Sequence, residues 1–417
     1  MDKLKIFGKA NLKGFINIPG SKNAALPIMA CSILSNENLR LKNMPNLLDI
    51  KTMQKLLKSF GLNFYSDQDS LTLNSKNLVN NVADYNLVNK MRASILVLGP
   101  LLSRFKKVKI SLPGGCAIGT RPINLHLFGL KKLGAKFFFE DGYIVAKIKD
   151  RLIGNIINFP TVSVGATENI IMAAVLAKGK TKIVNAAREP EIQDLVKCLN
   201  KMGAKIKGAG KKIIEIEGVS KLNQAEHSII SDRIVAGTYT IAAIMLNKNF
   251  VVKNVNPEHL IKPIKILKKM GANLIIGKNH IEIKNSKLIK GINIETKPYP
   301  GFPTDLQAQM MALMSVISGK SKIKENIFEN RFMHVSELNR LGANITVKNE
   351  TAIIQGNNKL KGAQVMASDL RASVSLVIAG LYAKGCTTIN RVYHLDRGYE
   401  SIENTLGKCG PRIVRIN

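Results

Sequence analysis

Tryptophan is absent from these 417 residues, and aromatic side chains make up only 5% of them. Acidic residues are also few, since 29 Asp and Glu stand against 62 Lys and Arg and leave a formal net charge of +33. A nucleic-acid-binding protein usually gathers its basic residues into patches or recognised modules. Here the lysines are scattered along the whole chain, so we predict no specific nucleic-acid partner.

Cysteine and long apolar runs are scarce as well. The five cysteines lack paired or metal-type spacing, which suits a reducing compartment and predicts neither disulfides nor a metal site. The longest apolar runs, such as residues 170–177, are much shorter than the roughly 18–20 residues that span a bilayer. The first residues also lack the apolar core of a signal peptide. We therefore expect a cytoplasmic protein without a membrane partner.

Arginine is the rarer of the two basic residues, with 14 Arg against 48 Lys. Lysine enrichment of this kind is typical of AT-rich coding, in which lysine becomes the default polar residue of the surface. Arginine offers a planar, bidentate fork that lysine lacks. The positions that keep arginine are therefore candidates for function.

Six segments share one pattern, an amphipathic run that ends in glycine and continues as a β-type sequence. Their glycines recur at steps of 68 to 73 residues: Gly61, Gly134, Gly203, Gly271, Gly342 and Gly410. Glycine directly after an amphipathic run predicts the end of a helix. A more uniformly apolar stretch precedes each run and predicts a buried helix. These stretches are residues 23–34, 92–102, 165–177, 234–246, 306–317 and 371–383.

Each repeat therefore predicts a buried helix, a strand, an outer helix and further strands. The sixth repeat stops after one strand, whereas residues 3–8 and 14–19 form two strands with no helix before them. We infer that these N-terminal strands complete the last repeat. Three repeats then form a domain of residues 22–230, and three form a domain of residues 1–21 and 231–417. The chain crossings near residues 21 and 230 favour a hinge and a cleft that closes.

The starts of the buried helices carry unusual polar residues. Helix starts expose free N–H groups and favour anions. If the repeats pack symmetrically, these starts converge on a phosphate-binding cleft that holds two carboxylates. The residues at the starts are Lys22, Arg92, Ser163, Val164, Gly165, Arg233, Asp305, Asp369 and Arg371. Three further arginines follow strands in equivalent loops: Arg121, Arg331 and Arg397.

These residues also have simpler structural interpretations. Asp305 and Asp369 can be helix N-caps, a common use of aspartate. The arginines can form ion pairs with adjacent acids, namely Arg331 with Glu329 and Arg397 with Asp396. Three histidines share no metal-ligand spacing and favour structural roles: His126, His334 and His394.

Residues 111–122, SLPGGCAIGTRP, place Cys116 five residues before Arg121 in a loop of glycine and proline. A free cysteine is commonly a small buried hydrophobe, which is the simpler interpretation. The paired glycines indicate close backbone access, and a nearby guanidinium favours the thiolate. Cys116 is therefore a candidate reactive thiol.

Eight motifs together resemble the enolpyruvyl transferase family, and in particular its UDP-N-acetylglucosamine 1-carboxyvinyltransferases. They are PGSKNAALPI, SLPGGCAIGTRP, VSVGAT, NAAREPEI, FPTDLQAQ, ENRFMHVSEL, GAQVMASDLRAS and HLDRGYE. The similarity runs from about residue 4 to residue 410 and touches all six repeats. It implies an α/β (α+β) fold of two inverse α/β, barrel-like domains, each with three repeats of buried helices, sheets and outer helices.

The resemblance implies a cytoplasmic enzyme of peptidoglycan synthesis that uses no cofactor and no metal. Its small-molecule substrates are phosphoenolpyruvate and UDP-N-acetylglucosamine. The 3′-hydroxyl of the sugar attacks C2 of phosphoenolpyruvate while C3 gains a proton, and phosphate then leaves from a tetrahedral intermediate. Such a site must hold anions, supply one proton and remove another.

The same resemblance implies the residues that perform the reaction. It assigns catalytic roles to Cys116, Asp305, Lys22, Arg121, Arg397 and Asp369. Cys116 is the proton donor to C3 and can add to phosphoenolpyruvate, whereas Asp305 is the base beside the attacking hydroxyl. Lys22, Arg121 and Arg397 clamp phosphoenolpyruvate. Substrate binding falls to Asn23, Arg92, Leu125, Ser163, Val164, Gly165, Ile327, Arg331 and Arg371.

Two positions depart from the family pattern. Asn124 stands where the motif RPxDLH has aspartate, and Thr161 stands where many members have lysine. Both positions belong to the uridine and diphosphate end of the substrate. Loss of the lysine is expected to weaken diphosphate binding by roughly 0.5–1.5 kcal/mol, which raises KM without abolishing activity.

Two other functions stay open at this point. A sister enzyme that acts on shikimate 3-phosphate shares the fold and the phosphoenolpyruvate chemistry, but it would not need the cysteine loop. A basic, non-catalytic protein of this fold would bind nucleic acid in a salt-dependent way without turnover. The sequence leaves the oligomeric state open.

Overall fold

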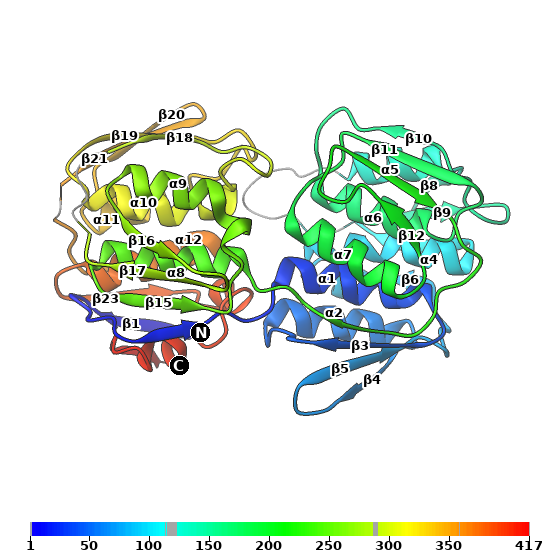
Figure 1. The fold of residues 1–417 in the computed structure, drawn as a ribbon, viewed down its shortest axis with the longest axis horizontal. Helices are drawn as coiled ribbons and strands as arrows, with labels where there is room; N and C mark the ends of the chain where they lie inside the picture. The colour runs from blue at the N-terminus through cyan, green and yellow to red at the C-terminus, as the bar shows by residue number, and fades with distance from the viewer. Residues whose placement is uncertain (1, 113, 115–122, 287–290, 358, 417) are drawn as a thin grey trace. The chain divides into compact units, whose positions relative to one another are not determined.

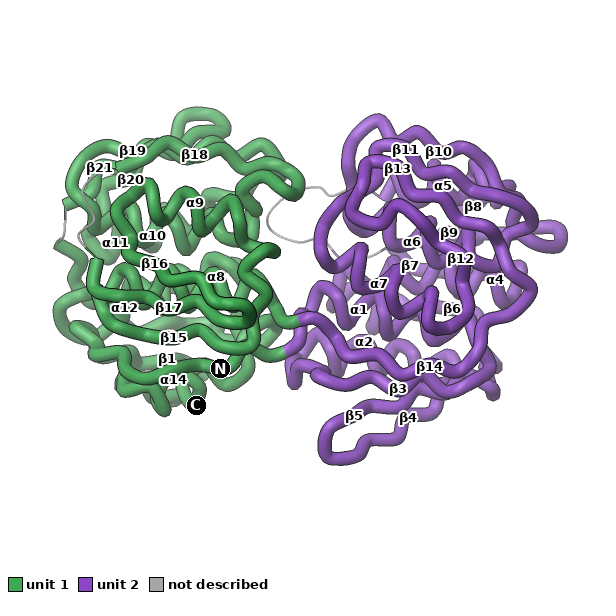
Figure 2. Tube along the Cα trace, viewed as in Figure 1, with its two compact units in different colours: residues 1–19, 116–120, 231–417 green, residues 20–115, 121–230 purple. Residues whose placement is uncertain are grey.

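The computed structural model describes residues 2–112, 114, 123–286, 291–357 and 359–416. The predicted proton donor Cys116 and the predicted clamp residue Arg121 therefore lie outside the described residues. Among those described, residues up to 19 and from 231 onward form unit 1, and residues between 20 and 230 form unit 2 (Figure 2).

Each unit is built around three apolar helices, all at the positions that the repeats predict (Figure 1). In unit 2 they are α1 (Lys22–Cys31), α4 (Leu98–Phe105) and α6 (Val164–Ala174). In unit 1 they are α8 (Arg233–Met245), α10 (Gln307–Val316) and α12 (Leu370–Tyr382). Two of them follow a 3₁₀ turn, η2 (Arg92–Val97) before α4 and η4 (Thr304–Leu306) before α10. Nearly all of their side chains are buried because the helices are apolar on every face.

Amphipathic helices cover these centres, and each ends at one of the six repeated glycines. They are α2 (Leu48–Ser59), α5 (Asn124–Lys132), α7 (Pro190–Lys201), α9 (Ile261–Lys269), α11 (Val335–Arg340) and α14 (Ile402–Gly407). All six glycines have a positive φ between 94° and 108°, a conformation that side chains oppose. Shorter turns are η1 (Ser32–Leu34), α3 (Tyr85–Val88), η3 (Pro257–Leu260) and α13 (Tyr393–Asp396).

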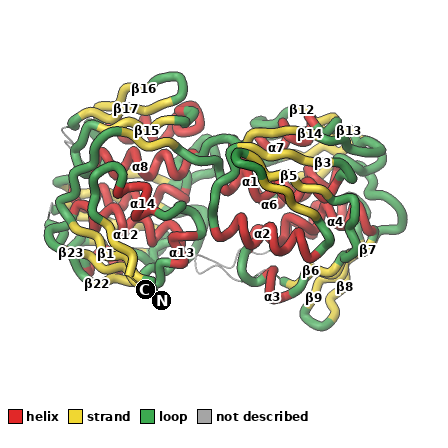
Figure 3. Tube along the Cα trace, turned by 90° about the horizontal axis from the view of Figure 1, so that it is seen from below, coloured by secondary structure: helices red, strands yellow, loops and turns green. Residues whose placement is uncertain are grey.

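Three four-stranded sheets surround the helices of unit 2, as far as the structure describes them. The first is β14 (Ala225–Ser228), β3 (Asn38–Lys42), β5 (Ser70–Asn74) and β4 (Asn63–Ser66). The second is β6 (Val82–Ala83), β7 (Lys107–Ser111), β9 (Tyr143–Lys147) and β8 (Lys136–Glu140). The third is β10 (Ile156–Asn158), β11 (Lys180–Val184), β13 (Ile213–Glu217) and β12 (Lys205–Lys207). Figure 3 shows these strands toward the outside of the unit.

Unit 1 repeats this plan in its described residues. Its sheets are β2 (Phe15–Asn17), β15 (Phe250–Lys253), β17 (His280–Lys284) and β16 (Asn273–Ile276); then β18 (Asn293–Glu295), β19 (Gly319–Lys324), β21 (Thr351–Gly356) and β20 (Ile345–Lys348). The last is β22 (Gln364–Met366), β23 (Cys386–Asn390), β1 (Lys3–Phe7) and β24 (Ile413–Ile416). In every sheet the first pair is parallel and the other pairs are antiparallel.

The N-terminal strands divide between two sheets. Strand β1 lies between β23 and β24 and completes the sixth repeat, as predicted. The same prediction is wrong for β2, which pairs in parallel with β15 of the fourth repeat. In the other four sheets, the chain runs from the parallel edge strand into a buried helix and then into the strand with which the edge strand pairs. Strands β2 and β14 instead end where the chain crosses to the other unit. The pairs β2–β15 and β14–β3 therefore close each unit into a ring of three repeats.

Each unit has its own apolar core. One cluster of buried side chains gathers residues from 24 to 229, and the other gathers residues 4–18 together with residues from 234 onward. Strands such as β13 alternate exposed and buried residues, so one face of each sheet packs on the helices. Within the described part of the chain, every helix is too short or too polar to cross a membrane.

Candidate active site

Asp305 lies in the turn η4 and is held by two arginines of unit 1. Its Oδ1 accepts a hydrogen bond of 2.9 Å from Arg331 Nη2, and its Oδ2 accepts one of 2.8 Å from Arg371 Nη2. Both guanidinium groups are buried, whereas the Asp305 side chain keeps 27% of its surface exposed. The carboxylate is thus fixed from behind and remains accessible, and Asp305 is not the N-cap that a simpler interpretation allows.

A chain of hydrogen bonds supports Asp305 from the interior. The Thr238 hydroxyl donates its only hydrogen to a backbone carbonyl one turn earlier, so it accepts from Tyr399 Oη (2.8 Å) and from Gln309 Nε2 (3.0 Å). Gln309 Nε2 also donates to the backbone carbonyl of Asp305 at 3.0 Å. Tyr399 is also close enough to Arg371 for each to shift the pKa of the other. The hydroxyls of Thr238 and Tyr399 therefore each donate in one direction, and Gln309 holds the turn that carries Asp305.

Burial alone lowers the pKa of Arg371, and the carboxylate of Asp305 raises it. The net effect raises the pKa, so the guanidinium stays charged at any physiological pH. Burial also raises the pKa of Tyr399, which stays a neutral phenol. Arg371 is therefore charged when a substrate binds.

Asp369 caps helix α12. It accepts hydrogen bonds from the Arg371 amide (2.8 Å) and the Ala372 amide (3.1 Å), so here the N-cap interpretation is right. Two histidines lie close enough to feel its charge. Burial lowers the pKa of His334 to about 4, although Asp369 raises it. Burial and Arg397 lower the pKa of His394, and Asp369 opposes both effects.

The alternative ion pairs are not the ones that adjacency in sequence predicts. Arg331 pairs with Asp305 rather than with its neighbour Glu329. Asp396 accepts two hydrogen bonds, of 3.0 and 2.7 Å, from the C-terminal Arg415. Asp396 therefore anchors strand β24.

In unit 2, Lys22 is the first residue of α1 and pairs with Asp49 at the start of α2. The Nζ–Oδ2 distance is 3.0 Å, and both side chains are at least nine-tenths buried. The pair presents a lysine at a helix start, where backbone N–H groups also favour anions. Nothing in the sequence around Asp49 distinguishes it from the acidic residues of the protein surface.

His126 of α5 packs against the start of α6. The Asn169 side-chain oxygen accepts from the Gly99 amide, which directs its nitrogen toward His126 Nδ1 at 3.0 Å. His126 therefore carries its proton on Nε2, and a Cβ added to Gly165 would lie 3.4 Å from that atom. Burial and Arg92 lower the pKa of His126 to about 3, so the ring is neutral.

The remaining predicted residues lie partly at helix starts and partly in loops, such as those after β19 and α13. Ser163 caps α6 by accepting from the Ala166 amide at 3.3 Å, so Val164 and Gly165 form its first turn. Asn23, Arg92, Leu125, Ile327 and Arg397 are all partly buried. The two departures from the family pattern, Asn124 and Thr161, are exposed. Around the described residues we find no group of three His, Cys, Asp or Glu side chains that could hold a metal ion.

A model of the family described as EPSP synthase (3-phosphoshikimate 1-carboxyvinyltransferase) matches residues 6–406. The chain therefore belongs to the enolpyruvyl transferase family, as its motifs indicate. Proteins named UDP-N-acetylglucosamine 1-carboxyvinyltransferase are about half identical to it along their whole length.

One such relative, from Pelagibacter ubique (strain HTCC1062), is 54% identical over 417 residues, which cover 100% of both chains. Another, from Bartonella henselae (strain Houston 1), is 51% identical over 429 residues, again with 100% of both chains covered. A third, from Paramagnetospirillum magneticum (strain AMB-1), is 50% identical over 100% of this chain and 99% of its own.

Solved structures share the fold at lower identity. The enolpyruvyl transferase NikO from Streptomyces tendae superposes with a TM-score of 0.90 at 21% identity, over 99% of this chain and 98% of its own. EPSP synthase from Acinetobacter baumannii gives a TM-score of 0.77 at 19% identity over 100% of both chains. The predicted α/β fold of two three-repeat domains is confirmed, with separate open sheets rather than a closed barrel in the described residues.

Proposed function

We propose that this chain transfers the enolpyruvyl group of phosphoenolpyruvate to the 3′-hydroxyl of UDP-N-acetylglucosamine and releases phosphate, a step of peptidoglycan synthesis. The hydroxyl oxygen bonds to C2 while C3 gains a proton. The proton then leaves C3, and the bond from C2 to the phosphate oxygen breaks. The observation that carries this proposal is the 54% identity, over the whole of both chains, to a relative of that name.

Unit 1 supplies the proposed base. Both oxygens of Asp305 accept from buried arginines and its side chain keeps 27% of its surface exposed, which supports Asp305 as the base that takes the proton of the attacking hydroxyl. Arg331 and Arg371 are too buried to move freely, which supports a role in holding Asp305 and the substrate. Arg397 and Asp369 complete the proposed unit 1 set.

Unit 2 supplies the proposed anion contacts. Lys22 and Arg121 are the clamp residues for phosphoenolpyruvate, together with Arg397 of unit 1. The free N–H groups at the start of α6, beside Ser163, support diphosphate binding there. The predicted roles of Asn23, Arg92, Leu125 and Ile327 in holding the sugar nucleotide remain part of this proposal.

The domain boundaries and the compartment also stand as proposals. The two units in which the described residues pack support domains of residues 22–230 and of residues 1–21 with 231–417. Four described cysteines, Cys31, Cys198, Cys386 and Cys409, are all free thiols. Their state supports a reducing, cytoplasmic compartment.

One specific observation favours a second candidate, since the matching family model is named for shikimate 3-phosphate chemistry. A phosphate-release assay with phosphoenolpyruvate separates the two. Turnover with UDP-N-acetylglucosamine is the expected result, and turnover with shikimate 3-phosphate alone would overturn the proposal.

The role of Cys116 needs its own test. Cys116→Ser is expected to abolish or greatly reduce turnover, and a small phosphonate epoxide is expected to inactivate the enzyme by alkylation. Cys386 is the exposed thiol among the described cysteines. The matched control is therefore Cys386→Ser, which should stay active and still be inactivated. Full activity of Cys116→Ser would remove Cys116 from the mechanism.

A further inference from the structure

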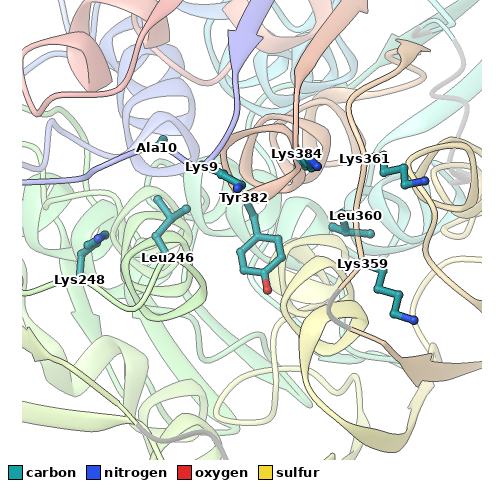
Figure 4. A pocket seen from close by; sticks show the side chains of 9 residues that line it. All are labelled: Lys9, Ala10, Leu246, Lys248, Lys359, Leu360, Lys361, Tyr382 and Lys384. Atoms are coloured by element: carbon teal, nitrogen blue, oxygen red, sulfur yellow. The ribbon is translucent and has the colours of Figure 1, made fainter.

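Unit 1 contains a pocket of about 560 Å³ at the C-terminal ends of two buried helices (Figure 4). Leu246 directly follows α8, and Tyr382 is the last residue of α12; both line the pocket. The caps Asp232 and Asp369 lie at the other ends of these helices, which are 13 residues long. A helix of that length spans roughly 20 Å, so the pocket is separate from the candidate active-site residues of unit 1.

Five of the nine lining residues are lysines: Lys9, Lys248, Lys359, Lys361 and Lys384. Lysine makes up 48 of the 417 residues, so composition alone would place about one there. Within the part of the chain that the structure describes, none of the five ammonium groups forms an ion pair or a hydrogen bond. The pocket therefore gathers positive charge that the protein does not balance.

Two of these lysines come from adjacent backbone segments. Lys361 and Lys384 are partners in an isolated parallel bridge, and both side chains are exposed. Like charges on paired strand positions disfavour each other. A bound anion would offset this repulsion, which agrees with an anionic ligand.

Cations at helix C-terminal ends also have a structural explanation, because they complement the exposed carbonyls. Unit 2 follows that explanation. Arg104 Nη1 donates to the Ile33 carbonyl at 3.0 Å, and Arg151 Nη2 donates to the Leu176 carbonyl at 2.7 Å. The five lysines of unit 1 form no such bonds among the described residues, so helix ends do not account for them.

The remaining lining is apolar. Leu246 and Leu360 are buried, Ala10 is partly buried, and Tyr382 stands between the two leucines as a half-buried ring. We propose that this pocket binds a nucleotide-type anion, a molecule that joins two or more phosphate groups to a planar base. Lysines suit phosphates as point charges, and the Tyr382 ring and the leucines suit the base. A concavity of this size fits a small molecule. The inference goes beyond the proposed function and does not depend on it.

The test is calorimetric titration with ATP at low ionic strength, with and without UDP-N-acetylglucosamine present. We expect Lys361→Glu/Lys384→Glu to weaken ATP binding at least about tenfold, in line with the loss of two charge contacts. The matched control is Lys262→Glu/Lys265→Glu, which makes the same charge change at two exposed positions of α9. It should weaken binding less than about twofold. Thermal unfolding midpoints verify that both variants fold.

A second comparison tests the apolar part of the ligand. Tyr382→Ala should weaken ATP binding about fivefold and leave the binding of inorganic tripolyphosphate unchanged, because only ATP carries a base that stacks on the ring. Equal affinity of the unaltered protein for both ligands would overturn the nucleotide class. Absence of ATP binding, or equal weakening by the two double variants, would overturn the pocket. No turnover is measured, so these outcomes are independent of the phosphate-release assay.

Discussion

Asp305 shows how a single carboxylate is made ready for proton transfer. Its two oxygens accept from Arg331 and Arg371, and its backbone carbonyl is linked through Gln309 and Thr238 to Tyr399. A carboxylate on an exposed turn would sample many rotamers, whereas this one is confined by groups whose own positions are determined. The orientation of the proposed base therefore depends on a phenol that touches no substrate in our proposal.

Tyr399→Phe tests this dependence. The change keeps the ring and removes the hydroxyl, so Thr238 loses a donor and Arg371 loses a polar neighbour in a buried site. We expect kcat to fall about tenfold, with little change in KM for UDP-N-acetylglucosamine, because Tyr399 positions the base and does not bind the sugar. Steady-state kinetics on both substrates measure the two quantities.

The matched control is Tyr393→Phe, which removes the hydroxyl of an exposed tyrosine in the same segment. It should leave kcat unchanged. A Tyr399→Phe enzyme with normal kcat would show that Arg371 and Asp305 hold their positions without the phenol.

The buried His334 predicts acid sensitivity of unit 1. Burial lowers its pKa to about 4 from an ordinary value near 6.5, so between these pH values the unfolded chain binds more protons than the folded one. Stability is then full above about pH 6.5 and is lost as the pH falls toward 4, by about 3 kcal/mol. Urea unfolding at pH 7 and pH 4.5 should show this loss.

His334→Gln should lose much less stability on acidification, because glutamine does not titrate. His280→Gln, at a partly exposed histidine of the same unit, serves as the control and should behave like the unaltered protein. An unchanged acid loss in His334→Gln would assign the effect to other groups.

Single residues were the hardest part of the site to predict. Asp305 and Lys22 could be singled out because they stand at helix starts and in recognisable motifs. Their partners Arg371, Asp49 and Tyr399 differ in this respect. Arg371 and Tyr399 lie in family motifs, although the motifs gave Tyr399 no role, whereas Asp49 reaches its site only through folding, and the sequence around it resembles an ordinary helix. Contacts between segments that are far apart in the sequence produce no local sequence pattern from which they could be predicted.

At the scale of elements, the six C-terminal glycines act as independent stop signals. Each takes a positive φ after an outer helix, and the following amides bond back into the last turn, as Ala135 does to Leu130 and Ala204 to Leu199. Their surroundings differ. A Cβ on Gly134 would meet nothing within 4 Å, whereas one on Gly410 would lie 2.4 Å from the Asn11 carbonyl oxygen.

This difference predicts a graded series of alanine variants. Gly134→Ala should lower the free energy of unfolding by about 1–2 kcal/mol, the cost of a left-handed conformation alone. Gly410→Ala should cost at least about 1 kcal/mol more, because a backbone oxygen must also move. Denaturant unfolding curves give both values.

Gly407→Ala provides the control inside helix α14, where nothing lies within 4 Å and φ is negative. It should be neutral or stabilise by up to about 1 kcal/mol. Equal costs at positions 134 and 410 would contradict the role of the Asn11 carbonyl.

Elements were largely predictable because their signals are local. Apolar stretches and glycines located the buried and outer helices within each repeat, and the β-type sequence after each glycine located a strand. Strand partners were less predictable. The sequence of β2 resembles that of any short edge strand, and nothing in it distinguishes β15 from β23 as a partner. The pairing of β2 with β15, more than 200 residues later, depends on how the three repeats of unit 1 close into a ring.

At the scale of the whole molecule, the protein has a net charge of +33, and both substrates of the proposed reaction are anions. A positive field raises the rate at which anions reach the protein, and salt screens it. KM for phosphoenolpyruvate should therefore rise about threefold or more between low and physiological ionic strength, whereas kcat changes little. Kinetics in a potassium chloride series measure this, with sucrose at equal osmolarity as the control. A KM that is independent of salt would mean that the scattered lysines do not act on the substrate.

The position of β1 between β23 and β24 has a consequence for biosynthesis. A ribosome makes β1 first and its two neighbours last, about 400 residues later. At about 5–20 residues per second this delay is roughly 20–80 s. Unit 2 can close its ring as soon as β14 has emerged, and β2 can pair once β15 is made, but β1 must wait unpaired for β23 and β24. Nascent chains of this protein should therefore carry a folded middle between an unfinished beginning and an unfinished end.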